Sequence, residues 1–248
     1  VPFPFNESER SQQMQWHYNN TGNVFAQASR LGADANVYAA WQLSTGDPDV
    51  IVAVVDQGVK YDHEDLAANM WVNEAELNGT PGVDDDGNGY VDDVYGYNFV
   101  KNTGVISWDD VSDTGHGTHV AGVIAAQNNN GIGISSIAGG DGNIPGAKIM
   151  SCQIFSGDTA GNALSTVKAI KYAADNGAVI CQNSWGDTFG EDGVFYISYY
   201  DTNIGTHNVV YTKIEEPGNY DHIYQSDLCG WVGQLGYCLL YTSDAADD

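Results

Sequence analysis

The sequence predicts an α/β protein with three layers, in which a mostly parallel central sheet carries helices on both faces. Residues 49–55 read DVIVAVV, an apolar β-branched run that is typical of a central strand buried on both sides. Strand-like segments near 147–154 and at 178–182 alternate with helical patterns at 116–126 and 163–176. Because strands that alternate with helices form parallel sheets through right-handed crossovers, this order predicts the fold class.

The first half of the chain leads from a polar segment into this sheet. Residues 1–40 are polar with isolated aromatic side chains, and we expect an N-terminal strap that enters the domain at Ala40-Trp41. The strand 49–55 is followed by a long loop at 57–112 and by a helix that begins at His116. The run 120–126 is small and apolar, which predicts that this helix is buried on all sides.

The second half begins with the strand near 147–154 and the helix 163–176. That helix ends at Asn176-Gly177, a pair typical of a helix C-terminus. One face of it is apolar and consists of Leu164, Val167 and Ile170. The strand 178–182 follows, and residues 208–212 have a further strand-like pattern.

Composition limits the possible partners. The chain has 248 residues, enough for one large domain with a substantial core. Eight Lys plus Arg against 33 Asp plus Glu give a formal net charge of −25, which argues against nucleic acid and anionic membranes as partners. No apolar run approaches the roughly 20 residues that span a bilayer. Residues 1–10 also lack the basic start and apolar stretch of a signal peptide.

The four cysteines match no zinc signature in their spacing; they are Cys152, Cys181, Cys229 and Cys238. Cys152 and Cys181 lie in predicted buried strands. Because adjacent parallel strands seldom have good disulfide geometry, we expect this pair to be free thiols.

Two segments carry residues that are suited to catalysis. Residues 113–126 read DTGHGTHVAGVIAA, in which Gly115 and Gly117 leave the backbone beside the His116 imidazole bare for a substrate. Asp56 follows the strand 49–55 at its carboxyl end, where open α/β sheets build their sites. An Asp that precedes its His in the chain fits the order Asp, His, Ser of subtilisin-type enzymes.

The segments VIVAVVDQGVKYDHEDL and DTGHGTHVAG resemble the Asp and His motifs of the subtilisin-like serine proteases, the subtilases. The resemblance implies a subtilisin-like fold, truncated at the C-terminal side, with an Asp-His-Ser triad. Asp56 would orient the imidazole, and His116 would accept the proton of the serine. The second histidine, His119, would be structural and packed internally. The motif departs at Gln57, where the family has a small Ser, Thr, Asp or Gly, and the larger side chain could crowd the site.

The resemblance also assigns substrate contacts. Ser184, Trp185 and Gly186 resemble the family's Ser-x-Gly segment, whose extended backbone pairs with the substrate like an added strand. Residues 157–161 match the opposite wall of the substrate cleft loosely. Ordinary turns at strand ends are the alternative for both segments.

Beyond residue 186 the family pattern fails. Asn219 is the candidate for the oxyanion-stabilising Asn, about 30 residues after the Ser-x-Gly segment. The nucleophile motif Gly-Thr-Ser-x-Ala-Ala-Pro is missing, and Ser243 follows Asn219 too closely to replace it. We therefore expect a partial peptidase domain at 41–228, without activity as given, and a non-native tail at 229–248 that resembles sequencing-adapter read-through.

An acidic loop predicts a calcium site. Residues 84–93 read DDDGNGYVDD, with oxygen-bearing side chains at alternate positions and a glycine after the third. Calcium loops need such hard oxygen ligands and a glycine for the sharp turn, but Tyr95 replaces the closing Glu of an EF-hand. The predicted ligands are Asp84, Asp86, Asn88, Asp92 and Asp93. An acidic solvent-exposed turn is the alternative.

A second calcium site is implied by the resemblance alone. Its ligands would be Asp65, nine residues after Asp56, and Asn129, thirteen residues after His116. The alternative is that Asp65 caps a turn and that Asn129 lies in a polar loop.

Together these features predict a fragment of a secreted, calcium-stabilised serine endopeptidase that acts on polypeptides as a monomer, with its signal peptide and propeptide upstream of residue 1. A calcium-binding pseudoprotease without activity is the first alternative. The second is a metal-dependent hydrolase that uses Asp113, His116 and His119. Metalloprotease helices place two histidines four residues apart with a Glu between them, so H-x-x-H here is a poor match.

Overall fold

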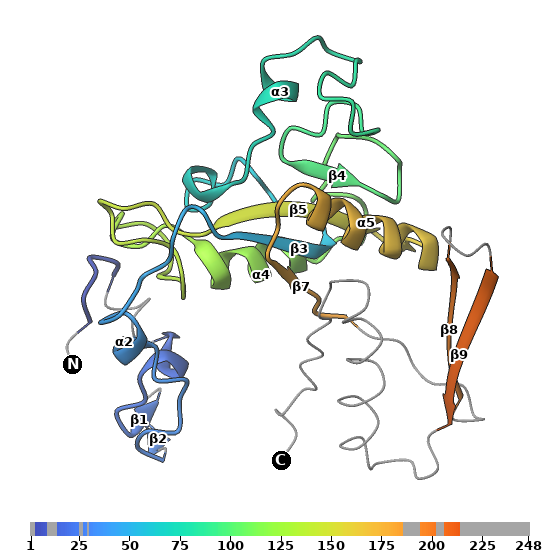
Figure 1. Cartoon of the computed structure of the whole chain (residues 1–248). Coiled ribbons are helices and arrows are strands. Elements are labelled where there is room, and N and C mark those ends of the chain that lie inside the picture. Colours follow the sequence, from blue (N-terminus) through green and yellow to red (C-terminus); the bar gives the residue numbers. More distant parts are fainter. Residues whose placement is uncertain are drawn as a thin grey trace. The chain divides into compact units, whose positions relative to one another are not determined.

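The computed structural model describes residues 3–8, 14–24, 27–28, 30–185, 194–201 and 206–213. The chain divides into two compact units, Val1–Ser184 and Trp185–Asp248. The first unit contains a central sheet with the strand order β4-β5-β3-β7 (Figure 1). These strands are Gly96–Asn98 (β4), Lys148–Ser156 (β5), Ile51–Gln57 (β3) and Ile180–Gln182 (β7).

All neighbours along this order are parallel, as the alternation of strands and helices predicts. The sheet is extended by a short antiparallel strand, β6 (Thr159–Ala160), which pairs with β5. In β3, the four residues 52–55 are all buried, as expected for the centre of a sheet that is covered on both faces. The predicted strands at 49–55, 147–154 and 178–182 are thus confirmed as β3, β5 and β7.

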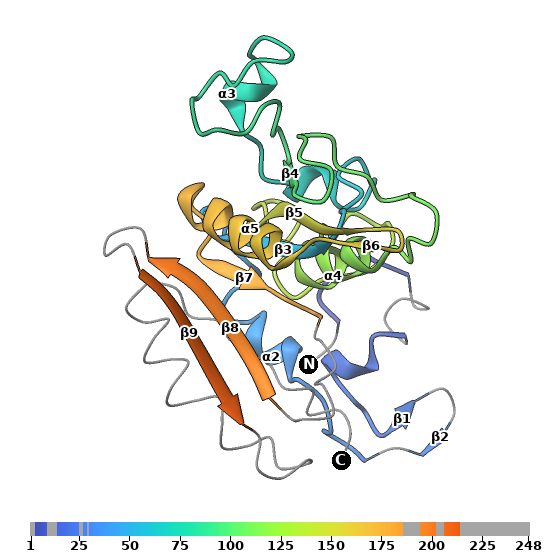
Figure 2. The same ribbon diagram turned by 90° about the vertical axis from the view of Figure 1, so that its right-hand side faces the viewer.

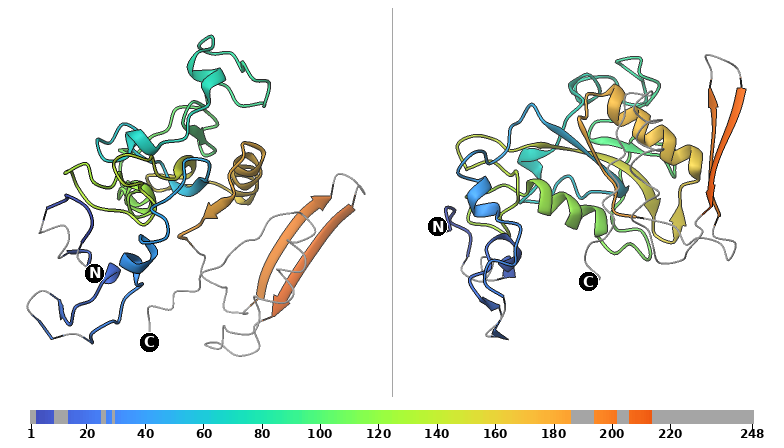
Figure 3. Two further views of the ribbon diagram at one scale, coloured as in Figure 1. Left: turned by 60° about the vertical axis from the view of Figure 1, so that its left-hand side comes forward. Right: turned by 60° about the horizontal axis from the view of Figure 1, so that its bottom comes forward.

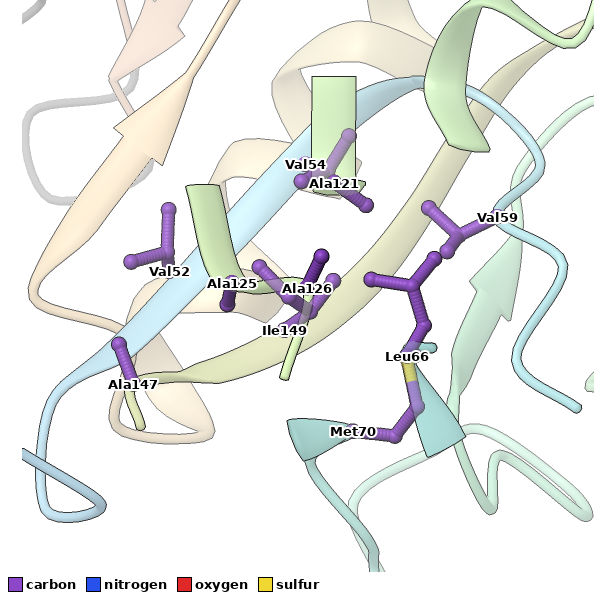
Figure 4. Packing of buried hydrophobic residues seen from close by; sticks show 10 residues of the cluster. All are labelled: Val52, Val54, Val59, Leu66, Met70, Ala121, Ala125, Ala126, Ala147 and Ile149. Atoms are coloured by element: carbon purple, nitrogen blue, oxygen red, sulfur yellow. The ribbon is translucent and has the colours of Figure 1, made fainter. Parts of the chain in front are cut away.

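Two helices cover opposite faces of this sheet, α4 (His116–Ala125) and α5 (Ala163–Asp175) (Figure 2). Small side chains let α4 lie close to β3, and Ala121 and Ala125 pack on Val52 and Val54 (Figure 4). The same core cluster includes Val59, Leu66, Met70, Ala126, Ala147 and Ile149. The three-layer fold class is therefore confirmed.

The burial of α4 differs from the prediction. Ala121, Gly122 and Ala125 are buried, whereas Val120 and Ile124 are only partly covered by the described residues. The helix is buried on the side that faces the sheet and not on all sides, because the described part of the chain covers it from one side.

The ends of α5 are set by local chemistry. The side chain of Asn162 accepts a hydrogen bond from the backbone N–H of Ser165 at 2.9 Å and caps the first turn. At the other end Gly177 has φ +87°, and the N–H of Ala178 donates to the carbonyl of Ala173 at 2.9 Å. This is the pattern of a helix that stops at a left-handed glycine, as Asn176-Gly177 predicts.

The apolar face of α5 read from the sequence is not the one that packs on the sheet. Ala169, Tyr172 and Ala173 are buried. Leu164 and Val167 are 61% and 59% exposed among the described residues. The large aromatic ring of Tyr172 and two alanines form the contact face, and the spacing of aliphatic side chains along the sequence does not indicate these residues.

The N-terminal strap packs through aromatic side chains. Its elements are a 3-10 helix at Trp16–Tyr18 (η1), the strand pair Asn23–Val24 (β1) and Gln27–Ala28 (β2), and the helix Val37–Ala40 (α2). Tyr18, Val37 and Trp41 are buried together, and Phe3 and Phe5 lie against them. The indole N–H of Trp41 donates to the carbonyl of Ile137 at 3.0 Å, which ties this cluster to the loop after α4.

The segment 57–112, predicted as a loop, contains three short elements. They are the 3-10 helix Ala67–Asn69 (η2), the helix Glu74–Leu77 (α3) and the strand β4. Figure 3 shows that α3 and the loop after it extend away from the sheet. Three or four residues are too few for a periodic pattern, so the sequence does not reveal these elements.

The second unit contains an antiparallel pair, β8 (Val194–Asp201) and β9 (Thr206–Lys213). The predicted strand-like segment 208–212 lies within β9. Gly186, Asn219, Cys229, Cys238 and the tail 229–248 lie outside the described residues. In the part of the chain that the structure describes, no helix has the length and hydropathy needed to cross a membrane.

Candidate active site

β3 and α4 bring Asp56 and His116 together from positions that are 60 residues apart. Asp56 lies at the carboxyl end of β3, where a register shift against β5 falls between Asp56 and Gln57. His116 is the first residue of α4. Its Nδ1 lies 2.8 Å from Oδ1 and 2.9 Å from Oδ2 of Asp56.

The two partners differ in exposure. The side chain of Asp56 is 3% exposed, whereas that of His116 is 46% exposed. Burial raises the pKa of the Asp56 carboxyl, and the hydrogen bonds from His116 and from the N–H of Gln57 act against this rise. Because a carboxylate only accepts hydrogen bonds, Nδ1 must donate, which leaves the lone pair of the neutral ring on Nε2.

Gln57 does not crowd this pair. Its side-chain oxygen Oε1 accepts from the N–H of Thr114 at 3.2 Å, from the Thr114 hydroxyl at 3.1 Å and from the N–H of His116 at 3.1 Å. The carboxamide therefore lies against the N-terminus of α4. The sequence marks Gln57 only as an unusual residue and does not indicate this contact.

His119 and Asp113, the other titratable residues of the His motif, do not share the position of His116 beside Asp56. His119 is exposed among the described residues, so its expected internal position is wrong for this part of the chain. Asp113 accepts from the N–H of Asp110 at 2.9 Å and of Gly157 at 2.7 Å. Among the described residues, no metal-ligand group forms from Asp113, His116 and His119, the set that the metal-dependent hydrolase would need.

The predicted substrate segment leaves the sheet near Asp56. Gln182, the last residue of β7, pairs with Val54, so the backbone of Ser184 emerges at the same edge of the sheet as Asp56. Ser184 is exposed, and its hydroxyl oxygen accepts from Nε2 of Gln182 at 2.6 Å. Trp185 is partly buried.

The acidic loop and α3 together form a cluster of three carboxylates. One oxygen each from Glu76, Asp86 and Asp93 lies within 4.8 Å of the other two, which makes a group that could hold a metal ion. Glu76 and Asp93 are buried, and Asp86 is exposed. Nδ2 of Asn88 donates to Asp86 and to Asp93, each at 3.1 Å. The hydroxyl of Tyr172 donates to Asp93 at 2.6 Å and connects α5 to this loop.

The remaining predicted ligands of the loop have backbone partners. Asp84 accepts from the N–H groups of Gly87, Asn88 and Gly89 at 2.7, 3.1 and 2.8 Å. These bonds, first that from Gly89, lower the pKa of the Asp84 carboxyl. Asp92 accepts from the N–H of Gly82 at 3.0 Å. Glu76, which completes the cluster, lies in α3 outside the DDDGNGYVDD segment, and no sequence pattern links it to that segment.

Asp65 and Asn129 lie in a second polar region, together with Glu7 of the strap. Asp65 is buried and accepts from Nδ2 of Asn130 at 2.8 Å and from the N–H of Ile134 at 3.1 Å. The buried Glu7 carboxylate accepts from the N–H of Asn129. Burial raises the pKa of Asp65, and the charge of Glu7 adds to that rise. The side chain of Asn129 donates to the carbonyl of Asp141 at 3.1 Å.

Comparisons with known proteins identify the family to which this sequence is similar. A protein-family model described as the Subtilase family matches residues 47–225. Subtilisin-like protease 1 of Plasmodium vivax is 43% identical over 134 residues, which are 54% of this chain and 20% of that protein. The halolysin-like extracellular serine protease of Natrialba magadii is 36% identical over 152 residues, 61% of this chain and 23% of that protein.

A solved structure is similar in fold. A chain in the crystal structure of the Aeromonas sobria serine protease and chaperone complex has a TM-score of 0.56 at 23% identity. The likeness covers 76% of this chain and 27% of that chain, and it shows the fold alone. This chain thus spans about a fifth of the length of the curated relatives that it matches.

Proposed function

The chain belongs to the subtilase family, and we propose that it forms part of a secreted, calcium-stabilised serine endopeptidase that hydrolyses polypeptides. The observation that carries the proposal is the pairing of His116 with the buried Asp56 at 2.8 Å. In a neutral imidazole held in this way, Nε2 carries no proton and can accept one, as a general base must.

In the proposed reaction a serine from a downstream segment attacks the peptide carbonyl carbon. His116 takes the hydroxyl proton on Nε2 as the new C–O bond forms, and Asp56 stabilises the resulting imidazolium. The imidazolium then gives the proton to the leaving amine as the C–N bond breaks. Water repeats the sequence on the acyl-enzyme and releases the carboxylic acid.

The substrate would bind along Ser184, Trp185 and Gly186 as an added strand. The exposed Ser184 and its position at the same sheet edge as Asp56 support this role. Asn219 stays the candidate for the oxyanion donor. Because the 248 residues contain no Gly-Thr-Ser-x-Ala-Ala-Pro segment, we expect this chain by itself not to hydrolyse peptides.

Calcium would be held by the cluster of Glu76, Asp86 and Asp93. Burial raises the pKa of Asp93, and the charges of Asp86 and Glu76 add to the rise, so the three carboxylates repel one another without a cation between them. Hard oxygen donors of this kind suit Ca²⁺. Asp84, Asn88 and Asp92 shape the loop, and Asp65 with Asn129 and Glu7 is the second candidate region.

Secretion of the protein is supported by two observations. The relative from Natrialba magadii is described as extracellular. The net charge of −25 is typical of acidic extracellular or halotolerant proteins.

The test begins with the source DNA, sequenced from the codon for Asp187 onward. If an open frame restores the serine motif, the encoded protein should hydrolyse casein, and His116→Ala or Asp56→Asn should reduce turnover by about 10²–10⁴-fold or more. Hydrolysis that survives both substitutions would contradict the proposal.

The carboxylate cluster of Glu76, Asp86 and Asp93 supports a second candidate, a calcium-binding pseudoprotease. A genuine stop codon after Asp248, together with a melting temperature that depends on calcium, would establish this candidate and reject the peptidase.

A further inference from the structure

The N-terminus of α4 is capped from another element. The residue before the helix, Gly115, has φ +74° and no side chain that could accept a hydrogen bond. The first N–H groups of a helix have no partner within the helix, and a side-chain oxygen usually satisfies one of them. Here Oε1 of Gln57 fills this role, because it accepts from the N–H of His116 and from two groups of Thr114.

Asp56 and Gln57 are consecutive and hold two different parts of one residue. Asp56 accepts from the imidazole of His116 at 2.8 Å, and Gln57 accepts from its backbone N–H at 3.1 Å. The main chains also lie close, since a Cβ on Gly117 would meet the carbonyl oxygen of Gln57 at 2.0 Å. Side chains as short as Ser or Gly at position 57 would not span the distance that the Gln side chain bridges.

We propose that Gln57 is a positioning residue, whose carboxamide fixes the backbone of His116 so that the imidazole stays in register with Asp56. The proposal rests on the proposed function, in which this pair performs the proton transfer. Gln57 itself touches no reacting atom. Its carboxamide restricts the movement of the first turn of α4 relative to β3. Less conformational entropy is therefore lost when the Asp56–His116 hydrogen bond forms.

The test is an NMR comparison on the uniformly ¹⁵N-labelled 248-residue chain. Gln57→Met removes the acceptor and keeps the length, whereas Gln57→Glu keeps an acceptor oxygen. We expect Gln57→Met to speed deuterium exchange at the His116 amide about tenfold, since one hydrogen bond is lost, and to broaden the Nδ1–H resonance of His116. Gln57→Glu should retain both signals.

A matched control is Asn162→Ala, which removes the corresponding cap of α5. It should speed exchange in the first turn of α5 and leave the His116 signals unchanged. Gln57→Met signals equal to those of the unmodified chain would overturn the proposal. The proposal would also be overturned if Gln57→Met sped deuterium exchange at the amides of α5 as much as at the His116 amide. A merely structural role of Gln57 would loosen both helices.

The experiment also separates this inference from the proposed function. An unmodified chain without a protected Nδ1–H at His116 would reject the Asp56–His116 pair itself. A resonance that is present and insensitive to position 57 would overturn only the role of Gln57.

Discussion

Asp56 and Asp110 are two carboxylates near the candidate site whose pKa values shift in opposite directions. Asp56 is almost fully covered, and burial raises its pKa. Asp110 is bound by Lys101 Nζ at 2.7 Å and by the Ser107 hydroxyl at 2.6 Å, with Ser156 as a third donor. These donors, first Lys101, lower the pKa of Asp110 to about 2. The loop before His116 is thus held by a carboxylate that stays charged in mild acid.

The pH dependence of stability should therefore include a contribution from Asp110. A carboxyl whose pKa falls on folding, here from about 4 to about 2, stabilises the fold fully above pH 4 and loses this effect as the pH falls to 2. We expect Asp110→Asn to melt at a lower temperature than the unmodified chain at pH 6. The difference should shrink between pH 4 and pH 2, as measured by circular dichroism.

The control for this prediction is Asp62→Asn, because Asp62 pairs with Lys60 at 2.5 Å on an exposed surface. Exposed pairs contribute little, so this variant should differ from the unmodified chain only slightly at every pH. A difference for Asp110→Asn that stays constant from pH 6 to pH 2 would contradict the prediction.

At the scale of elements, the contact between β3 and the first turn of α4 sets the geometry of the candidate site. Gly117 allows this contact, since a side chain there would collide with the backbone carbonyl of Gln57. Gly122, in the same helix, faces more space, because among the described residues a Cβ there would approach Ile134 Cδ1 at 3.8 Å, an ordinary van der Waals distance. The close backbone contact therefore requires glycine at position 117, whereas the space around position 122 would accept a methyl group.

Alanine substitutions should separate these two glycines. We expect Gly117→Ala to lower the free energy of unfolding by about 2 kcal/mol, since backbone must shift to relieve the overlap. Gly122→Ala should instead raise it by up to about 1 kcal/mol, because alanine favours the helix. Urea unfolding followed by circular dichroism measures both values. Equal effects of the two substitutions would show that α4 does not lie against Gln57 as described.

At the scale of the whole molecule, an excess of negative charge makes the fold dependent on how its acidic groups are compensated. The formal net charge is −25, and only eight Lys plus Arg oppose 33 Asp plus Glu. The loop that carries Asp86 and Asp93 extends away from the sheet (Figure 3), and Tyr90 in this loop packs on Tyr97, Phe99 and Tyr172. A cation bound among Glu76, Asp86 and Asp93 would connect α3 to this loop.

Removal of calcium should lower the stability of the chain. A ligand at about 100 times its Kd adds about 2.7 kcal/mol to a fold that binds it. For a chain of this size we expect a melting temperature about 5–10 °C lower in EGTA than in calcium. Glu76→Gln should reduce this shift, whereas Asp62→Asn, which removes one exposed charge, should leave it unchanged. The same melting temperature with and without EGTA would reject the calcium site.

Much of the fold could be predicted because its signals are local. The β-branched run that forms β3 and the Asn176-Gly177 stop of α5 each act over a few residues, so chain order alone indicates a parallel sheet with crossover helices. The face on which α5 packs could not be predicted, because Ala169, Tyr172 and Ala173 are selected by the shape of the sheet beneath them.

The sequence by itself determined the family, the order of the longer strands and helices along the chain, and the residues Asp56 and His116 at their motif positions. Only the tertiary structure decided which groups meet: the Gln57 side chain with the backbone of His116, Glu76 with Asp93, and the Glu7 side chain with the backbone of Asn129. The physical reason is that each of these contacts joins residues that are distant in the sequence and that the fold brings close together. Hydrogen bonds act over about 3 Å in space, carboxylates gather over similarly short distances, and neither leaves a periodic signal along the chain.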